Sequence, residues 1–225
     1  MSAASDQDLA AITAALTDRK RGLFVAFEGG DGSGKSTQVR VLAQRLQDQG
    51  APVVATFEPG ATELGQQLRD LVQHGPEDVD ARTEALLYAA DRAYHAATMI
   101  RPELARGTSV ITDRYIDSSV AYQGIGRELG AEAVRALSVW ATDGLLPDLV
   151  LVLDVDSEVG ISRIGGNLDR LERAGDHFHE MVADHYRQAA EADPDHYVVV
   201  DAHGTPEEVH EAVVAALARA LEGRQ

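Results

Sequence analysis

A glycine-rich segment near the start of the chain has the composition of a phosphate-binding loop. It fits the pattern G-x-x-x-x-G-K-[ST] over Gly29, Gly30, Asp31, Gly32, Ser33, Gly34, Lys35 and Ser36, and Thr37 follows. The glycines let consecutive backbone N–H groups face an anion, and a helix that begins after the loop adds its positive end. In such loops the lysine reaches the β- and γ-phosphates and the hydroxyl binds Mg²⁺. The segment therefore predicts a nucleoside triphosphate site, with Ser36 as a metal ligand.

A second cluster of polar residues follows an apolar run at 110–112. It consists of Asp113, Arg114 and Tyr115. Charged residues at the carboxyl end of a parallel strand lie at the crevice where open α/β sheets bind ligands. We expect Asp113 to act on Mg²⁺, directly or through water, and Arg114 to grip a phosphate. The alternative is a structural ion pair at the strand end.

Apolar runs of strand length alternate with helical stretches, which is typical of an α/β fold with a parallel sheet covered on both faces. The sequence predicts five strands, at 23–28, 52–57, 109–112, 149–154 and 197–200. The predicted helices are 36–49, 61–73, 81–105, 131–142, 157–164, 176–192 and 206–221. Gly165-Gly166-Asn167 and the charged residues after it make a poor core, and predict a short mobile flap at about 160–175.

The length of 225 residues suits one domain, which we place at 21–225. Residues 1–20 form an N-terminal extension, in which Leu9, Ile12 and Leu16 have helical spacing. They predict either a short helix packed on the body or a frayed, disordered segment.

Composition narrows the class of protein. The chain has no cysteine, which excludes disulfides, thiolate metal sites and a cysteine nucleophile. Its net charge of −17 disfavours binding to a nucleic acid polymer or an anionic membrane, but not a small nucleotide in a pocket with its own arginines. No leader and no bilayer-spanning run is recognisable, so we expect a cytoplasmic protein.

A phosphate-binding loop alone could serve a GTPase, a motor ATPase or a small-molecule kinase. The N-K-x-D motif of guanine recognition is missing from the sequence, and a motor would need a larger body. The second cluster favours the kinase.

Several blocks together resemble the thymidylate kinase family, whose members phosphorylate dTMP with ATP. The matching blocks are residues 27–38, 58–60, 86–93, 113–124, 147–149, 153–156 and 169–172, so that the resemblance covers about 22–202. The run from Asp-Arg-Tyr to Ala-Tyr-Gln-Gly at 113–124 is quite specific to this family. The resemblance implies a P-loop kinase fold with a LID flap, ATP as donor, Mg²⁺, and a homodimer.

The resemblance also implies roles for residues. Lys35, Arg114, Asp31 and Arg170 would be catalytic, and the dTMP site would consist of Asp31, Glu58, Tyr88, Arg92, Arg114, Ser119, Tyr122 and Gln123. Within it Tyr88 would stack on thymine and Arg92 would donate to its O4. Ser119 and Gln123 would meet the N3 edge, and Tyr122 would crowd a 2′-hydroxyl. Asp31 would accept from the 3′-hydroxyl, and Arg114 would clamp the acceptor phosphate.

The chain departs from the family at Phe57, where many bacterial members carry an arginine that binds the acceptor phosphate. Arg69 or Arg114 would then carry more of that task. Phe57 either faces the phosphate or packs in the core, and the intact Glu-Pro-Gly beside it, with a proline that is cis in the family, favours the first. The flap is also lean in basic residues. The flap residues that would act as a cation on the transferred phosphoryl group are Arg163, Arg170 and Arg173. Arg170 is favoured because it lies in Asp-Arg-Leu-Glu.

Two other functions stay open at this point: a different nucleotide or nucleoside kinase of the same fold, and a nucleotide-binding regulatory protein with weak turnover. A zinc site is not expected at His177, His179 and His185, because Ala183 stands where H-E-x-x-H needs its second histidine. These histidines are predicted to be solvated helix residues.

Overall fold

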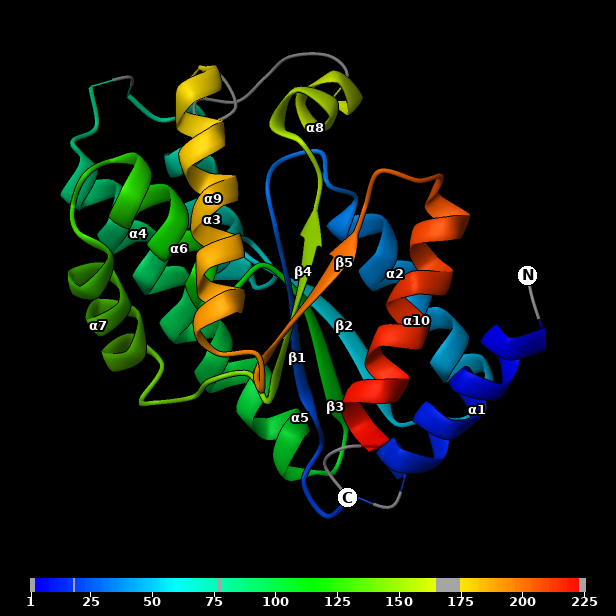
Figure 1. Ribbon diagram of the computed structural model, residues 1–225. Helices are drawn as coiled ribbons and strands as arrows, with labels where there is room; N and C mark the ends of the chain where they lie inside the picture. The colour runs from blue at the N-terminus through cyan, green and yellow to red at the C-terminus, as the bar shows by residue number, and fades with distance from the viewer. Residues whose placement is uncertain (1–2, 18, 77, 165–174, 223–225) are drawn as a thin grey trace.

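A five-stranded parallel sheet lies at the centre of the computed structural model, which describes residues 3–17, 19–76, 78–164 and 175–222 (Figure 1). The strand order is β2-β3-β1-β4-β5, and all four pairings are parallel. The strands are β1 (Phe24–Glu28), β2 (Val53–Phe57), β3 (Ser109–Asp113), β4 (Leu149–Asp154) and β5 (Tyr197–Asp201). The predicted α/β fold is confirmed, and each predicted strand is present to within one residue at either end.

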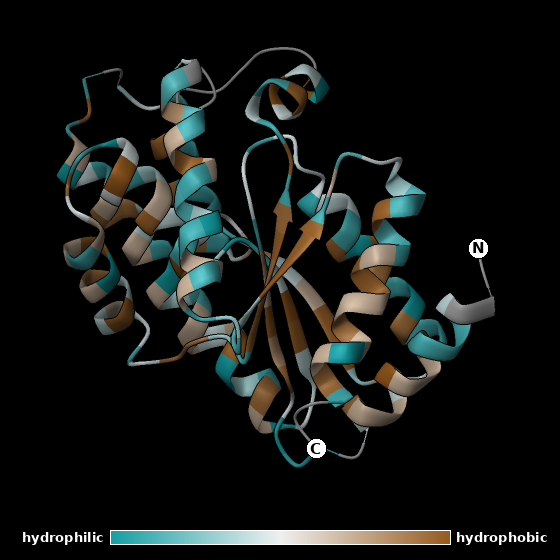
Figure 2. Ribbon diagram, in the orientation of Figure 1, coloured by the Kyte–Doolittle hydropathy of each residue, from teal (hydrophilic) through white to brown (hydrophobic). Residues whose placement is uncertain are grey.

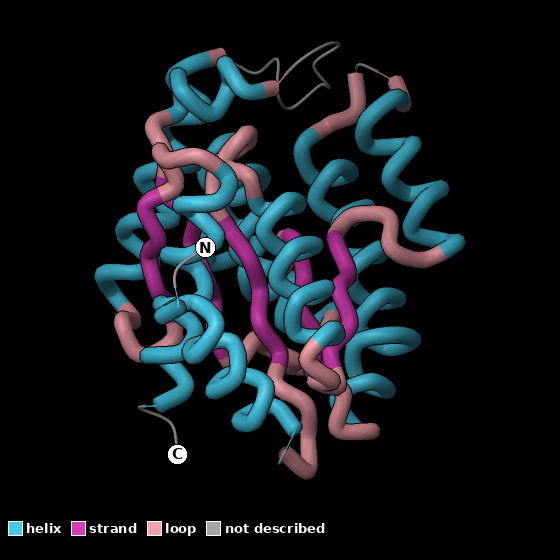
Figure 3. The backbone as a smooth tube through the Cα atoms, turned by 90° about the vertical axis from the view of Figure 1, so that its right-hand side faces the viewer, coloured by secondary structure: helices cyan, strands magenta, loops and turns pink. Residues whose placement is uncertain are grey.

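Helices cover both faces of this sheet (Figures 1 and 3). Their bounds are α1 (Ala3–Thr17), α2 (Lys35–Asp48), α3 (Glu63–His74), α4 (Ala81–His95), α5 (Arg101–Ala105), α6 (Ile116–Ser119), α7 (Ala131–Ala141), α8 (Ser157–Arg163), α9 (Asp176–Ala192) and α10 (Pro206–Glu222). Two π-helical segments, η1 (Ala96–Ile100) and η2 (Val120–Gly126), continue α4 and α6. None of the helices in these ranges is long and apolar enough to cross a bilayer.

The core is divided by the sheet, because successive side chains of a strand point to opposite faces. In β1, Val25 and Phe27 join a cluster with α1, α2 and α10, whereas Phe24 and Ala26 join a second cluster with η1, η2 and α9. Strands buried on both faces are apolar almost throughout, as the brown strands of Figure 2 show. This explains why the runs were recognisable in the sequence.

The N-terminal residues contribute to the first of these clusters. Leu9, Ile12 and Leu16 of α1 are buried, and α1 packs mainly against α10. The sequence allowed either a packed helix or a disordered segment here, and the described residues form the packed helix. The boundary at residue 20 stays a prediction.

Helical structure between β3 and α7 was missed by the sequence analysis. The segment runs as α6 and η2, and it carries Ser119, Tyr122 and Gln123. The predicted helix at 81–105 is present with a π-helical turn at η1. Most of the predicted flap, including Arg170, lies outside the described residues.

Candidate active site

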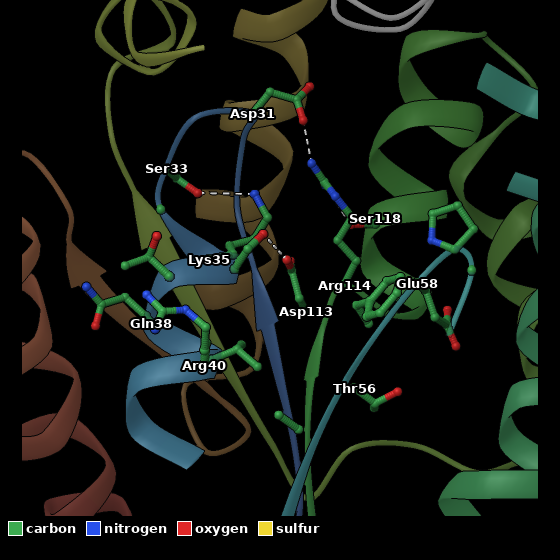
Figure 4. Close-up of a pocket in the computed structure, with 18 of the residues that line it drawn as sticks. Asp31, Ser33, Lys35, Gln38, Arg40, Thr56, Glu58, Asp113, Arg114 and Ser118 are labelled. Carbon is green, nitrogen blue, oxygen red and sulfur yellow. Dashed lines mark hydrogen bonds and ion pairs between the residues drawn. The ribbon is translucent and has the colours of Figure 1, made fainter. Parts of the chain in front are cut away.

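A cavity of about 1240 Å³ opens at the carboxyl ends of β1, β2 and β3 (Figure 4). It brings together the phosphate-binding loop, the segment after β3 and the α4 face. Among the residues that line it are the predicted site residues Asp31, Gly32, Ser33, Gly34, Lys35, Ser36, Thr37, Glu58, Tyr88, Arg92, Asp113, Arg114, Ser119, Tyr122 and Gln123. The two clusters recognised in the sequence therefore belong to one site.

The phosphate-binding loop is shaped by its glycines and its lysine. Gly32 and Gly34 have φ of 72° and 93°, and a Cβ on Gly32 would lie 1.9 Å from the carbonyl oxygen of Gly160. The α2 helix begins at Lys35, so its N-terminal N–H groups point into the cavity. Lys35 is buried and its Nζ donates to the loop itself, at 2.7 Å from Gly30 O. Burial, followed by the nearby Arg114, lowers the pKa of Lys35 to about 8.

Ser36 and Asp113 lie together at the floor of the cavity. The Ser36 hydroxyl donates to Oδ2 of Asp113, and Asp113 Oδ1 is buried without a hydrogen-bond partner among the described residues. A hydroxyl and a carboxylate with an unsatisfied oxygen suit Mg²⁺, which uses one or two protein oxygens together with phosphate oxygens and water. The described residues contain no group of three or more acidic, histidine or cysteine side chains with metal-binding geometry.

Arg114 and Asp31 bridge the phosphate-binding loop to the segment after β3. Arg114 Nη2 donates to Asp31 Oδ1, and its Nη1 donates to Ser118 Oγ at 3.1 Å. Although burial alone would raise it, Arg114 and then Lys35 hold the pKa of Asp31 below its usual value. Arg114 itself has φ of 69°, an uncommon conformation for a residue other than glycine. The protein thus imposes a special backbone shape where the guanidinium enters the cavity.

Glu28 at the end of β1 holds that backbone shape in place. It is fully buried, and its Oε1 accepts from the backbone N–H groups of Tyr115 at 2.8 Å and Ser118 at 3.1 Å. Its Oε2 accepts from the hydroxyls of Ser118 and Tyr186. Burial, and next the charge of Asp117, raise the pKa of Glu28. This supporting role of Glu28 was not predicted from the sequence.

The α4 helix supplies one wall of the cavity through Tyr88 and Arg92, one turn apart. Arg92 is only 1% exposed, and its guanidinium donates to Glu58, Ser119, Ser138 and the carbonyl of Tyr115. The bonds therefore hold the Arg92 guanidinium in one orientation.

Gln123 and Tyr122 lie across the cavity on η2. Gln123 donates to Glu84 at 2.9 Å, and the Arg114 guanidinium lies 5.0 Å from the Tyr122 ring centre. Both side chains are buried and both line the cavity. They are placed to contact a ligand that lies between α4 and Arg114.

Glu58 lies in the cavity wall, but its carboxylate faces the protein. Oε2 accepts from Arg92 Nε at 2.8 Å, and Oε1 is 2.9 Å from Nδ1 of His95. The Glu58-Pro59 peptide bond is cis. Both carboxylate oxygens are thus bonded to protein groups, and the contact between Glu58 and dTMP stays a prediction.

Phe57 does not pack in the core. Its side chain is 43% exposed and lines the cavity, so the core alternative is wrong. The Arg69 guanidinium lies 6.0 Å from the Phe57 ring centre and donates to Pro59 O at 2.8 Å. Arg69 therefore reaches the cavity beside Phe57.

Of the three flap arginines, only Arg163 lies in the described residues. Its Nη1 donates to Ala202 O at 2.8 Å and its Nη2 to His203 O at 2.9 Å. These bonds tie α8 to the segment after β5, on the cavity rim. Arg170 and Arg173 fall in the range 165–174 that is not described.

The histidines of α9 are less solvated than predicted. His179 was expected to be solvated, yet it is buried at the start of α9, with Nδ1 3.8 Å from Oδ2 of Asp31. The prediction failed because α9 packs across η2, which covers this face of the helix. His177 is exposed, as expected, whereas His185 is half-buried.

Comparison with known proteins gives a consistent result. A sequence model of the family described as thymidylate kinase matches residues 27–213. The thymidylate kinase of Clavibacter sepedonicus is 49% identical over 203 residues, covering 89% of this chain and 96% of that protein. That of Leifsonia xyli subsp. xyli is 51% identical over 191 residues, covering 84% and 90%. The crystal structure of thymidylate kinase from Ehrlichia chaffeensis superimposes with a TM-score of 0.74 at 30% identity, covering 87% of this chain and 98% of that one.

Proposed function

This chain belongs to the thymidylate kinase family, and from that premise we propose which of its residues carry the reaction. The protein is an ATP-dependent dTMP kinase that transfers the γ-phosphoryl group of ATP to dTMP, giving dTDP and ADP. A different nucleotide acceptor and a regulatory role with weak turnover are not favoured, because the relatives that match most of the chain carry this name.

The donor triphosphate occupies the loop at 29–37 in this proposal. The backbone N–H groups of the loop and Lys35 would meet the β- and γ-phosphates. Ser36 and Asp113 would hold Mg²⁺, which when bound neutralises charge on the phosphates. The support is the juxtaposition of the Ser36 hydroxyl with Asp113, whose second oxygen is buried without a partner among the described residues.

The acceptor dTMP occupies the other half of the cavity. We assign the base to Tyr88, Arg92, Ser119 and Gln123, and the sugar to Tyr122 and Asp31. Arg114 would bind the acceptor phosphate, with Arg69 as a second cation beside Phe57. The attacking atom is an oxygen of that phosphate, which is already ionised at neutral pH. Catalysis therefore needs alignment and charge neutralisation rather than a side-chain nucleophile.

Arg170 of the flap is our choice for the cation over the transferred phosphoryl group. Three arginines of the flap, Arg163, Arg170 and Arg173, are the candidates for this role. Arg163 has both terminal nitrogens bonded to backbone carbonyls, which suits an anchor better than a mobile cation. Arg170 lies in Asp-Arg-Leu-Glu, one of the sequence blocks that resemble the family.

We also propose a homodimer, formed through the outer face of α3, α4 and α7. These three helices pack side by side. They expose Leu64, Leu71, Leu86, Tyr94 and, on α7, Trp140 with 80% of its surface accessible. So many large apolar side chains on adjacent helices are typical of a protein interface. A cytoplasmic location is part of the same proposal, since ATP and dTMP are consumed there.

The observation that carries the assignment is the bond between Arg114 and Asp31, because it joins the donor loop to the acceptor half of one cavity. A coupled assay of ADP release over dTMP, dUMP, UMP, dCMP and thymidine tests it. We expect dTMP to be used best, with dUMP next. Faster turnover with dCMP or thymidine than with dTMP would contradict the acceptor assignment.

A further inference from the structure

We propose that His95 is a positioning residue for base recognition, which acts on the acceptor through Glu58 and Arg92. The inference rests on the proposed function of Arg92 toward the base. It concerns a buried chain of polar side chains behind the cavity wall, made of Thr56, His95, Glu58 and Arg92. His95 is 0% exposed, so it makes no direct contact with a ligand.

The His95 ring connects a strand to the loop that follows it. Nε2 lies 2.7 Å from Oγ1 of Thr56 in β2, and Nδ1 lies 2.9 Å from Oε1 of Glu58. A carboxylate can only accept, so the hydrogen between these two groups belongs to Nδ1 of His95. Both ring nitrogens are therefore engaged, and the ring orientation is set from both sides. Glu58, in turn, cannot rotate without breaking this bond.

Glu58 fixes the guanidinium from its other oxygen. Arg92 Nε donates to Oε2 at 2.8 Å, and Nη1 donates to Ser119 and Ser138, each at 3.1 Å. Nη2 donates to Tyr115 O at 2.9 Å. These bonds use four of the five N–H groups of an arginine. Because the guanidinium is planar and rigid, they also fix the direction of the remaining N–H of Nη2.

Arg92 lines the cavity, and we assign the remaining N–H of Nη2 to an acceptor atom of the ligand. A fixed donor favours a keto oxygen and disfavours an exocyclic amine, since the amine would leave the buried donor unpaired. A guanidinium released from Glu58 could turn away and tolerate either base. His95 should therefore control the preference between bases more than the chemical step.

The experiment compares kcat/KM for dTMP and dCMP in wild type, His95→Phe, Glu58→Gln and Arg92→Lys. Glu58→Gln is isosteric and gives a second break in the same chain if His95→Phe does not fold. His95→Gln serves as a rescue variant, because its amide can still donate to Glu58. Ile100→Ala is the matched structural control. It removes a buried apolar side chain at the end of η1, and Ile100 is not one of the four polar residues Thr56, His95, Glu58 and Arg92.

We expect His95→Phe and Glu58→Gln to lower kcat/KM for dTMP roughly 10- to 100-fold, the worth of one charge-assisted hydrogen bond. The value for dCMP should change less than about threefold, so the preference for dTMP collapses. His95→Gln should recover part of it, KM for ATP should stay unchanged, and Ile100→Ala should keep the wild-type preference.

Equal losses for both nucleotides in the His95 and Glu58 variants would overturn the proposal, because a purely structural role predicts that result. Arg92→Lys separates this failure from a failure of the proposed function. If Arg92→Lys lowers the preference while His95→Phe and Glu58→Gln do not, positioning by His95 is wrong. If Arg92→Lys also leaves the preference unchanged, Arg92 does not read the base.

Discussion

Lys35 is bonded to the same loop that would hold the donor phosphates, with its Nζ 2.7 Å from the carbonyl oxygen of Gly30. The ammonium also donates to Gly29 O at 3.0 Å and to Ser33 Oγ at 3.2 Å. Burial, and next the positive charge of Arg114, lower the pKa of this ammonium to about 8. The loop therefore carries a desolvated positive charge that an anionic ligand would stabilise.

Replacement of this cation gives the first prediction. Lys35→Ala should lower phosphoryl transfer by on the order of 10²–10³-fold, the usual effect of losing one preorganised charge donor. Thermal stability should not fall, because the substitution removes a buried charge rather than apolar packing. The chain's other lysine, the exposed Lys20, supplies the control Lys20→Ala. Turnover of folded Lys35→Ala within a few-fold of that control would contradict the loop assignment.

Asp91 should make stability depend on pH. Its carboxylate is buried next to Glu58, and burial first and Glu58 second raise its pKa to about 6. A folded-state pKa above the unfolded value means that stability falls as pH rises from about 4 to 6. The Gly60 N–H donates to Asp91 Oδ1 at 3.2 Å. An asparagine side chain could still accept this hydrogen bond, and because it does not ionise, stability would not fall with rising pH.

Asp91→Asn should therefore gain stability relative to wild type as pH rises, by about 1–3 kcal/mol between pH 4.5 and 7.5, at roughly 1.4 kcal/mol per pKa unit. Urea unfolding of both proteins at the two pH values measures the difference. A difference that does not vary with pH would show that Asp91 titrates normally in the folded protein.

Phe57→Arg tests the departure from the family. Because Phe57 is partly exposed and lines the cavity, arginine here would not be buried, and stability should change by less than about 0.5 kcal/mol. A second charge-assisted contact with the acceptor phosphate should lower KM for dTMP by about tenfold, or ~1.5 kcal/mol. Phe57→Leu is the control for loss of the ring. An unchanged or higher KM in a stable Phe57→Arg variant would contradict a phosphate-facing position.

Charged substitutions on the apolar face of α3 and α4 test the proposed dimer. Leu71 of α3 is 49% exposed and Leu86 of α4 is 56% exposed. A glutamate in an apolar interface would be desolvated without a partner, so Leu71→Glu and Leu86→Glu should each shift the protein to monomers. Sedimentation at several concentrations measures this, with Leu146→Glu, outside the three helices, as control. A wild type that sediments as a monomer at all concentrations would refute the dimer.

The fold was predictable because the strands are buried on both faces, so β1 and β4 read as continuous apolar runs. The phosphate-binding loop and Arg114 were predictable because their chemistry lies in contiguous residues. The helical segment α6–η2 was missed, since its serines and Gln123 line the cavity, and these polar residues and the glycines of η2 break the apolar period.

The supporting network could not be predicted from local pattern. His95 and Glu58 are 37 positions apart, and only the contact of the end of α4 with β2 and the loop after it brings them together. Likewise, the sequence shows His179 on a polar stretch of helix, and its burial depends on how α9 lies against η2. Residue types in a motif indicate which side chains can bind a ligand. Only tertiary contacts show which other residues hold those side chains in position.

Direct transfer of labelled phosphate tests the central claim most simply. Purified protein is mixed with Mg²⁺, dTMP and ATP labelled at the γ-phosphate, and the nucleotides are separated. We expect label in dTDP, little in the dCMP reaction, and almost none with Lys35→Ala. Label that is released as inorganic phosphate, or that appears faster in dCDP than in dTDP, would contradict it.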